Sequence, residues 1–346
     1  MPTRYDVTKE ELRELLSGEP RYRIDQVWQG LYGNLSDVES TTTLPKALRV
    51  QLDQELPLAL QEVTKRSADN GETTKWVFRL ADGATVETVL MEYNDRVTAC
   101  LSSQAGCAMG CTFCATGQAG FTRNLTAGEI VEQFIVAARE ALPRRLSNVV
   151  FMGMGEPLAN FDRLWTAIHR LHDDLGLSAR RLTVSTVGII PGIKKLTAAD
   201  LPVNLAVSLH AANDTTRTSL VPMNARYPLA DLFAACEEYV ETTGRRLSIE
   251  WALIDGVNDT EQAARELAAF VRPLRAHVNL IPLNPTPGYL VRGSSAQAVR
   301  DFAADLTELG VNATVRRTRG VEIDAACGQL AAEAVRATLR TSTGNI

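Results

Sequence analysis

Residues 96–114 read RVTACLSSQAGCAMGCTFC, and the architecture of the chain can be worked out from this stretch. Its beginning is a short run of apolar and β-branched side chains, which predicts a strand over residues 96–102. Three cysteines follow in a C-x3-C-x2-C run, at Cys107, Cys111 and Cys114. Loops that leave the carboxyl ends of parallel strands are where α/β sheets bind ligands. We therefore expect these thiols to mark a functional site.

Downstream of this stretch, short runs rich in Val, Ile and Leu alternate with helical patterns. The predicted strands cover residues 148–152, 181–185, 203–209, 247–254 and 278–283. The predicted helices cover residues 126–142, 164–173, 229–242, 261–272 and 296–309. Such alternation with fully apolar strands predicts an α/β fold with a parallel sheet. Counting residues 96–102, six strands are too few for a closed eight-stranded barrel, so we expect a partial (β/α)6 barrel.

Upstream of the stretch, the pattern is helical. Thr8 and Glu11 form a capping-box pattern, and Pro45 suits the first turn of a later helix. Asp82-Gly83 lies between two strand-like runs and predicts a hairpin. We therefore divide the chain into four parts. These are a helical accessory domain (residues 1–65), a β-hairpin connection (66–95), a core (96–330), and a C-terminal helix and tail (331–346).

Charge and hydropathy narrow the class of protein. The 346 residues carry 36 Lys and Arg against 41 Asp and Glu, a formal net charge of −5. This excludes a polycation but not a local basic patch that could bind nucleic acid. The sequence shows no apolar run long enough to span a membrane and no apolar signal segment at its start. We therefore expect a cytoplasmic protein with no membrane partner.

The clustered cysteines indicate a metal centre or catalysis. Four of the six cysteines fall close together, and in a cytoplasmic chain this favours metal binding over disulfides. A closed zinc site usually takes four ligands as two separated pairs, and the sequence offers no second C-x-x-C pair. Three cysteines suit a [4Fe–4S] cluster with one iron left open, while a zinc knuckle is the alternative. Cys236 lies in a helical pattern and is expected to be a buried core thiol.

The C-x3-C-x2-C run, with Phe113 before the last cysteine, resembles the radical S-adenosylmethionine (SAM) superfamily. Further segments resemble the RlmN/Cfr family of RNA adenine methyltransferases, in the same order along residues 87–330. These segments are residues 100–107, 120–125, 152–157, 208–210, 284–288 and 320–329.

The resemblance implies a radical SAM barrel with a [4Fe–4S] cluster and SAM as cofactors. Cys107, Cys111 and Cys114 match the cluster ligands. The positions that match SAM contacts are Gly155, Glu156, Ser185, Ser208, Leu209, His210 and Asn284. Cys327 matches a cysteine that becomes methylated, Cys100 a cysteine that resolves the protein–RNA intermediate through a disulfide bond, and Glu87 a proposed proton acceptor.

The reaction implied by the resemblance is methylation of carbon 2 of adenine. The substrates would be 23S rRNA at the peptidyl-transferase centre and tRNA at adenosine 37. Two SAM molecules would be used per turnover, one to methylate Cys327 and one to form a 5′-deoxyadenosyl radical. A flavodoxin-like or ferredoxin-like protein would donate electrons, the protein would be a monomer, and residues 1–65 would help to bind RNA.

Two alternatives remain open. Methylation at carbon 8 of the same rRNA adenine, an antibiotic-resistance activity, belongs to the Cfr branch, which we associate with a further cysteine where this chain has Ala105. A non-enzymatic iron–sulfur or zinc RNA-binding protein would need neither Cys327 nor a SAM pocket. The basic run Arg316, Arg317 and Arg319 just before the Cys327 segment is the expected contact for RNA phosphates.

Overall fold

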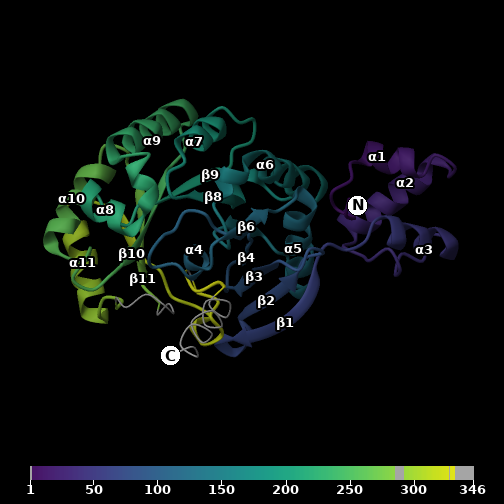
Figure 1. The fold of residues 1–346 in the computed structure, drawn as a ribbon, viewed down its shortest axis with the longest axis horizontal. Helices are drawn as coiled ribbons and strands as arrows, with labels where there is room; N and C mark the ends of the chain where they lie inside the picture. Colours follow the sequence, from purple (N-terminus) through teal and green to yellow (C-terminus); the bar gives the residue numbers. More distant parts are fainter. Residues whose placement is uncertain (1, 285–291, 327, 332–346) are drawn as a thin grey trace, which may run out of the picture.

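The computed structural model describes residues 2–284, 292–326 and 328–331. Its centre is a curved sheet of ten strands in the order β1-β2-β3-β4-β7-β8-β9-β10-β11-β12 (Figure 1). The parallel part runs from β4 to β12. Its strands are β4 Val97–Cys100, β7 Asn148–Phe151, β8 Leu182–Thr186, β9 Asn204–Ser208, β10 Ser248–Leu253, β11 His277–Pro282 and β12 Ala313–Val315. This confirms the predicted α/β fold with a parallel sheet.

Helices cover the outer side of this sheet (Figure 1). They are α5 Ala127–Glu140, α6 Phe161–His169, α7 Ile190–Thr197, α8 Asp214–Leu220, α9 Leu229–Thr243, α10 Glu261–Val271 and α11 Ala296–Glu308. They lie in the six connections that return the chain from the end of one parallel strand to the start of the next, with α8 and α9 both between β9 and β10. Helix α5 begins with the capping box of Thr126 and Glu129 and buries an apolar face that includes Ile130 and Phe134.

Three antiparallel strands extend the sheet beyond β4. They are β1 Gln61–Ala68, β2 Thr73–Arg79 and β3 Thr85–Glu92, and β3 pairs with β4. The prediction that residues up to 65 are helical is therefore wrong at its end, because β1 begins at Gln61. In β1 only Ala68 is buried, so the sequence lacks the apolar alternation that identifies a strand. The expected hairpin is part of the main sheet and continues it.

The first helices lie to one side of the sheet (Figure 1). They are α1 Lys9–Leu15, α2 Arg21–Trp28 and α3 Lys46–Glu55, and the predicted capping box of Thr8 and Glu11 starts α1. Polar contacts join this part to α5. Glu132 on α5 accepts hydrogen bonds from the backbone N–H groups of Ala59 and Leu60, at 2.8 and 3.0 Å. None of the described helices is both long and apolar enough to cross a bilayer. The predicted C-terminal helix falls on residues 332–346, outside the described residues.

Burial of Glu132 makes the stability of this junction depend on pH. Burial raises the pKa of its carboxyl from 4.5 to about 7, although the two backbone donors oppose the shift. The folded state therefore holds a proton that the unfolded chain has released, and the stabilisation is complete below pH 4.5 and is lost as the pH rises through about 7. From pH 5 to pH 8, we expect the free energy of unfolding of wild type, relative to Glu132→Gln, to fall by roughly 2–3 kcal/mol. Urea unfolding at each pH measures this difference.

Glu140→Gln is the matched control, because Glu140 is exposed at the end of the same helix. The free energy of unfolding of Glu140→Gln should stay within about 1 kcal/mol of the wild-type value from pH 5 to pH 8. If the free energy of unfolding of wild type changed with pH in parallel with that of Glu132→Gln, the raised pKa of Glu132 would be contradicted.

Candidate active site

The cysteine loop lies at the carboxyl end of β4 and is held by backbone contacts. A small second sheet, β5 Gln104–Gly106 with β6 Phe121–Asn124, brackets it. The Cys107 N–H donates to the Gly120 carbonyl at 2.8 Å, and Cys114 precedes the short helix α4 Ala115–Ala119. Cys107, Cys111 and Cys114 pack with apolar side chains that include Leu220 and Val221.

One cavity next to this loop gathers residues from the ends of several parallel strands. The positions predicted from the sequence that line it are Cys111, Cys114, Gly155, Glu156, Ser185, Ser208 and His210. Ser185 ends up beside Ser208 because β8 and β9 are neighbours, and their hydroxyl oxygens are 3.2 Å apart. Thiols, a carboxylate and hydroxyls therefore share one concave site, as a binding site for a polar cofactor requires.

The segment Met152–Pro157 approaches the β4 loop so closely that glycine is required. Gly155 has a φ of +101°, and a Cβ there would lie 2.4 Å from the Cβ of Gln104. The Gln104 side chain in turn accepts a hydrogen bond from the Glu156 N–H at 2.8 Å. This contact fixes Glu156 at the cavity wall.

Gly155→Ala is expected to destabilise the fold and disturb the cavity. Backbone strain together with the overlap should lower the free energy of unfolding by about 1–3 kcal/mol. It should also weaken binding of SAM, the cofactor that the sequence resemblance implies, by on the order of tenfold or more. Denaturant unfolding and calorimetric titration with SAM measure the two effects. Gly244→Ala is the control, because Gly244 also has a positive φ, +64°, but open space around it. If both variants bind SAM alike, the close approach of Gly155 has no role in the site.

Glu156 offers the cavity a buried carboxylate. Its two oxygens accept the N–H groups of Leu158 and Val187 at 3.0 and 2.9 Å, and the Thr186 side chain forms a third hydrogen bond with the carboxylate. Burial raises the pKa of this carboxyl to about 7, against the effect of the backbone donors. Among the described residues no Lys or Arg forms an ion pair with it. An ammonium group of a ligand would offset this burial.

His210 is neutral and fixed in orientation. Burial, followed by the charge of Arg217, lowers the pKa of His210 to about 3. Its Nδ1 accepts the Ala252 N–H at 3.0 Å, so the neutral ring carries its hydrogen on Nε2. Its backbone lies in the left-handed region, with a φ of +59°. These constraints agree with the expectation that His210 shapes the pocket.

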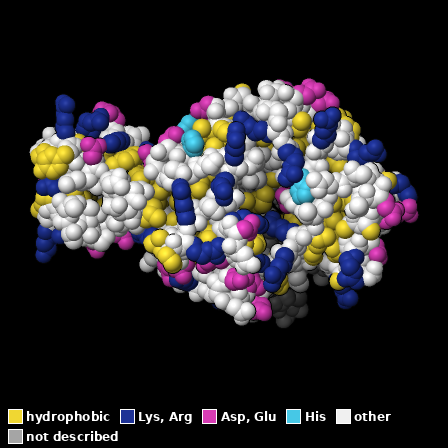
Figure 2. Space-filling model, turned by 180° about the vertical axis from the view of Figure 1, so that it is seen from behind, with side chains coloured by type: hydrophobic (Ala, Val, Ile, Leu, Met, Phe, Trp, Pro, Cys, Tyr) yellow, Lys and Arg dark blue, Asp and Glu magenta, His cyan; other side chains and the backbone are white. Residues whose placement is uncertain are grey.

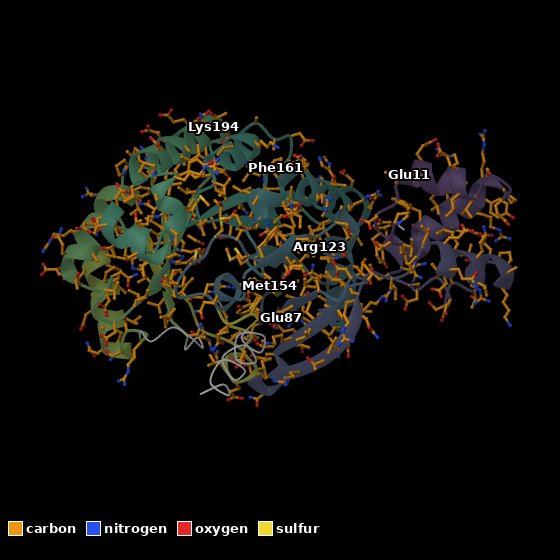
Figure 3. The ribbon with its side chains drawn as sticks, viewed as in Figure 1. Glu11, Glu87, Arg123, Met154, Phe161 and Lys194 are labelled. Atoms are coloured by element: carbon orange, nitrogen blue, oxygen red, sulfur yellow. The ribbon has the colours of Figure 1, made fainter. Side chains whose placement is uncertain are left out.

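The remaining predicted residues lie elsewhere. The Leu209 side chain is fully buried in the main hydrophobic core. Cys100 and Asn284 line a neighbouring cavity together with Ala325 and Ala326. Glu87 is 4% exposed and lines neither cavity (Figure 3). Cys327 lies outside the described residues, so the Cys100–Cys327 disulfide remains a prediction, and no two described cysteines form a disulfide with each other.

The three predicted RNA-contacting arginines differ in their surroundings. Arg319 donates to Glu72 at 2.8 Å, its side chain is only 8% exposed, and it lies over the ring of Tyr93. It also lines the cavity that contains Cys100, and its contact with RNA phosphates remains a prediction. Arg316 and Arg317 line the cavity that also contains Cys100. Figure 2 shows a hollow in the larger body with Lys and Arg side chains at its edge, so the acidic chain does carry local basic surface.

Comparison with known proteins identifies the family. Residues 101–268 match the model of the Radical SAM superfamily. The chain is 51% identical to a protein of Parafrankia sp. (strain EAN1pec), over 95% of this chain and 91% of that protein. It is 52% identical to a protein of Chloroflexus aurantiacus (strain ATCC 29366 / DSM 635 / J-10-fl), over 94% and 92%. Both carry the name "Probable dual-specificity RNA methyltransferase RlmN".

This chain belongs to the RlmN family of radical SAM RNA methyltransferases. The crystal structure of a radical SAM methyltransferase from Sphaerobacter thermophilus agrees, with a TM-score of 0.93 at 50% identity, over 96% of this chain and 100% of that chain. The predicted radical SAM fold and the prediction of an enzyme are thereby confirmed.

The site of this RlmN-family chain fits the cofactors of a radical SAM enzyme. Among the described residues, no three His, Cys, Asp or Glu side chains are grouped so that they could hold one metal ion. A [4Fe–4S] cluster does not need such a group, because each thiolate binds a different iron. Burial raises the pKa of Cys107 to about 12, so the thiol stays protonated until a cation offsets that burial. The adjoining carboxylate and hydroxyls suit the amino and polar groups of SAM.

Arg217 was not predicted from the sequence, and its side chain holds two loops of the RlmN-family site together. It is 1% exposed, and its guanidinium donates to the carbonyls of Val187 and Leu209, at 2.6 and 3.1 Å. It thereby ties the loop after β8 to the loop after β9. Its helix α8 is polar along the sequence, so no apolar pattern signals that this arginine is buried.

Proposed function

We propose that this chain methylates carbon 2 of adenine in 23S rRNA at the peptidyl-transferase centre and in tRNA at adenosine 37. The observation that carries the proposal is the juxtaposition of two cavities at the carboxyl ends of the strands. One contains Cys111, Cys114 and Glu156, and the other contains Cys100. The printed names of the relatives, which state dual specificity, support two RNA substrates.

The proposed cofactors are a [4Fe–4S] cluster on Cys107, Cys111 and Cys114, and SAM in the cavity that contains Glu156. When bound, they supply reductive cleavage of SAM to a 5′-deoxyadenosyl radical, which can act on a carbon that simple displacement cannot methylate. Glu156 holds the amino group of SAM, and the hydroxyls of Ser185 and Ser208 hold its polar groups. Arg217 and Gln104 fix the loops that carry these side chains.

Cys327 is proposed to carry the methyl group to the base. Ala325 and Ala326, the two residues before it, line the same cavity as Cys100. This agrees with the need for the Cα atoms of Cys100 and Cys327 to come within roughly 7 Å when their disulfide forms. Glu87 is proposed to accept the proton that carbon 2 loses. The adduct also gives back the one electron that was taken up when SAM was cleaved. The Cys100 thiolate then attacks the Cys327 sulfur, the carbon–sulfur bond breaks with its electron pair on carbon, and that carbon takes up a proton to become the methyl group of the released RNA. The disulfide that remains is reduced by cytoplasmic thiols.

The target base must be unpaired or flipped out, because carbon 2 lies on the base-pairing edge of adenine. Arg316 and Arg317 border the cavity where the base would enter. Residues 1–65 are proposed to contact folded RNA away from the reaction. The protein is proposed to act as a monomer in the cytoplasm and to receive its electrons from a flavodoxin-like or ferredoxin-like protein.

Mapping the methyl group decides between carbon 2 and carbon 8. Ribosomal RNA and tRNA from cells that lack the gene should be incubated with the reduced protein and SAM, and the nucleosides compared with 2-methyladenosine and 8-methyladenosine standards. We expect 2-methyladenosine from both RNAs. 8-Methyladenosine alone would assign the chain to the Cfr activity, and unmodified adenosine in both RNAs would overturn the proposed function.

A further inference from the structure

A buried ion pair on the antiparallel strands joins Glu87, the proposed proton acceptor, to Lys75, which has no role in the steps above. Lys75 on β2 and Glu87 on β3 are 2% and 4% exposed, and the Lys75 Nζ lies 3.1 Å from the Glu87 Oε2. A lysine in this setting loses its hydration, and the resulting cost has to be offset by close partners. A buried ion pair of this kind adds little net stability but fixes the positions of the groups that it contacts.

The pair contacts the C-terminal segment at two points. Lys75 Nζ donates to the Asp324 carbonyl at 3.2 Å, and the Ala331 N–H donates to the Glu87 Oε1 at 3.0 Å. These contacts join residues 249 and 244 positions apart in sequence. Glu87 lies in the interior beside Met154 in Figure 3, and Ser102 bonds to both residues, through the Glu87 carbonyl and the Met154 N–H.

The two carboxylate oxygens of Glu87 therefore have different partners. Oε2 forms the ion pair with the Lys75 ammonium, and Oε1 accepts the hydrogen bond from the Ala331 amide. The Lys75 ammonium therefore fixes the direction in which the Glu87 carboxylate presents its other oxygen to the Ala331 amide. Lys75 also reaches Asp324 directly. Its single charge therefore acts on the chain both before and after position 327.

We propose that Lys75 is a positioning residue for the methyl-transfer reaction. It orients the Glu87 carboxylate, and through Asp324 and Ala331 it sets where the described residues on either side of position 327 lie relative to Cys100. This rests on the proposed function for the reaction, whereas the positioning of the segment does not. Lys75 touches neither cavity and takes no part in bond making.

Amide hydrogen exchange on the reconstituted holoprotein tests the positioning directly. In Lys75→Met, exchange of the Ala331 amide should be faster by on the order of tenfold, while Lys75→Arg, which keeps the charge, should recover most of the protection. Should Lys75→Met not fold, the double variant Lys75→Met/Glu87→Gln, which buries no unpaired charge, should show the same faster exchange. Lys65→Met is the matched control, because Lys65 lies on the adjacent strand β1 but is exposed and pairs with Glu140. Its Ala331 amide should exchange as in wild type.

Steady-state kinetics then test the consequence for the reaction. In Lys75→Met, we expect kcat for RNA methylation to fall by on the order of 10- to 100-fold with the KM for RNA changed less than about threefold. Unchanged exchange at Ala331 in folded Lys75→Met, or in the folded double variant where the single variant does not fold, would overturn the inference even if wild type methylates RNA. Faster exchange with unaltered kcat would overturn the catalytic consequence. If wild-type protein methylates no RNA, only the proposed function fails, because the exchange result stands independently.

Discussion

We expect the reaction of the Cys100→Ala variant to halt before product release, with RNA covalently attached to the protein. In the proposed mechanism the methyl-bearing carbon of Cys327 joins the base, and release of the RNA then requires a second thiol that attacks the Cys327 sulfur. Cys100 is placed for this, since it ends β4 and shares a cavity with Ala325 and Ala326. Without that thiol, turnover should fall by on the order of 10³-fold or more, and denaturing gels should show a slower protein band that ribonuclease removes.

Cys236→Ala is the matched control for this experiment. Cys236 is fully buried in α9, away from both cavities, so the variant deletes the same sulfur atom from a core position. It should lose some stability but turn over RNA at close to the wild-type rate without an adduct. If Cys100→Ala turns over like wild type, the resolving role of Cys100 is wrong.

The Cys111→Ala variant is expected to lose the metal cluster and, with it, the reaction. Cys111 is 8% exposed, lines the cavity with Cys114 and packs among apolar side chains, and an alanine there provides no thiolate. Methyl transfer to RNA should drop by on the order of 10⁴-fold or more, because the remaining residues cannot generate a radical. Iron and sulfide analysis of anaerobically purified protein should show a loss of most of both.

Cys236→Ala again separates loss of a ligand from loss of a buried thiol, and it should retain its iron. Circular dichroism should show that Cys111→Ala is folded, so that the loss is local. A Cys111→Ala protein with a full complement of iron and sulfide would exclude this cysteine as a ligand.

The sequence predicted the features of this molecule that depend on local pattern. Apolar runs located the parallel strands β4 to β11, and the capping patterns at Thr8 and Thr126 located the starts of α1 and α5. The cysteine spacing, on a loop after a strand, located the site. Each of these signals lies within a short stretch of chain, so one sequence is enough to read it.

The parts that escaped prediction depend on contacts distant in sequence. Strand β1 has mostly exposed side chains, and β12 is three residues long, so neither shows an apolar pattern. The burial of Arg217 and the pairing of Lys75 with Glu87 follow from tertiary packing, which leaves no local trace. The same holds for the pairing of Arg319 with Glu72, which joins residues 247 positions apart in sequence.

The fate of deuterium in the transferred methyl group tests the central claim most directly. The protein should be purified without a methyl group on Cys327 and supplied with SAM that carries a fully deuterated methyl group, and the 2-methyladenosine released from RNA should be weighed. Because the proposed mechanism abstracts a hydrogen atom from the methyl group on Cys327 before that carbon joins the base, we predict a product with two of the three deuterium atoms. A product that retains all three would show direct displacement from SAM and would contradict the account.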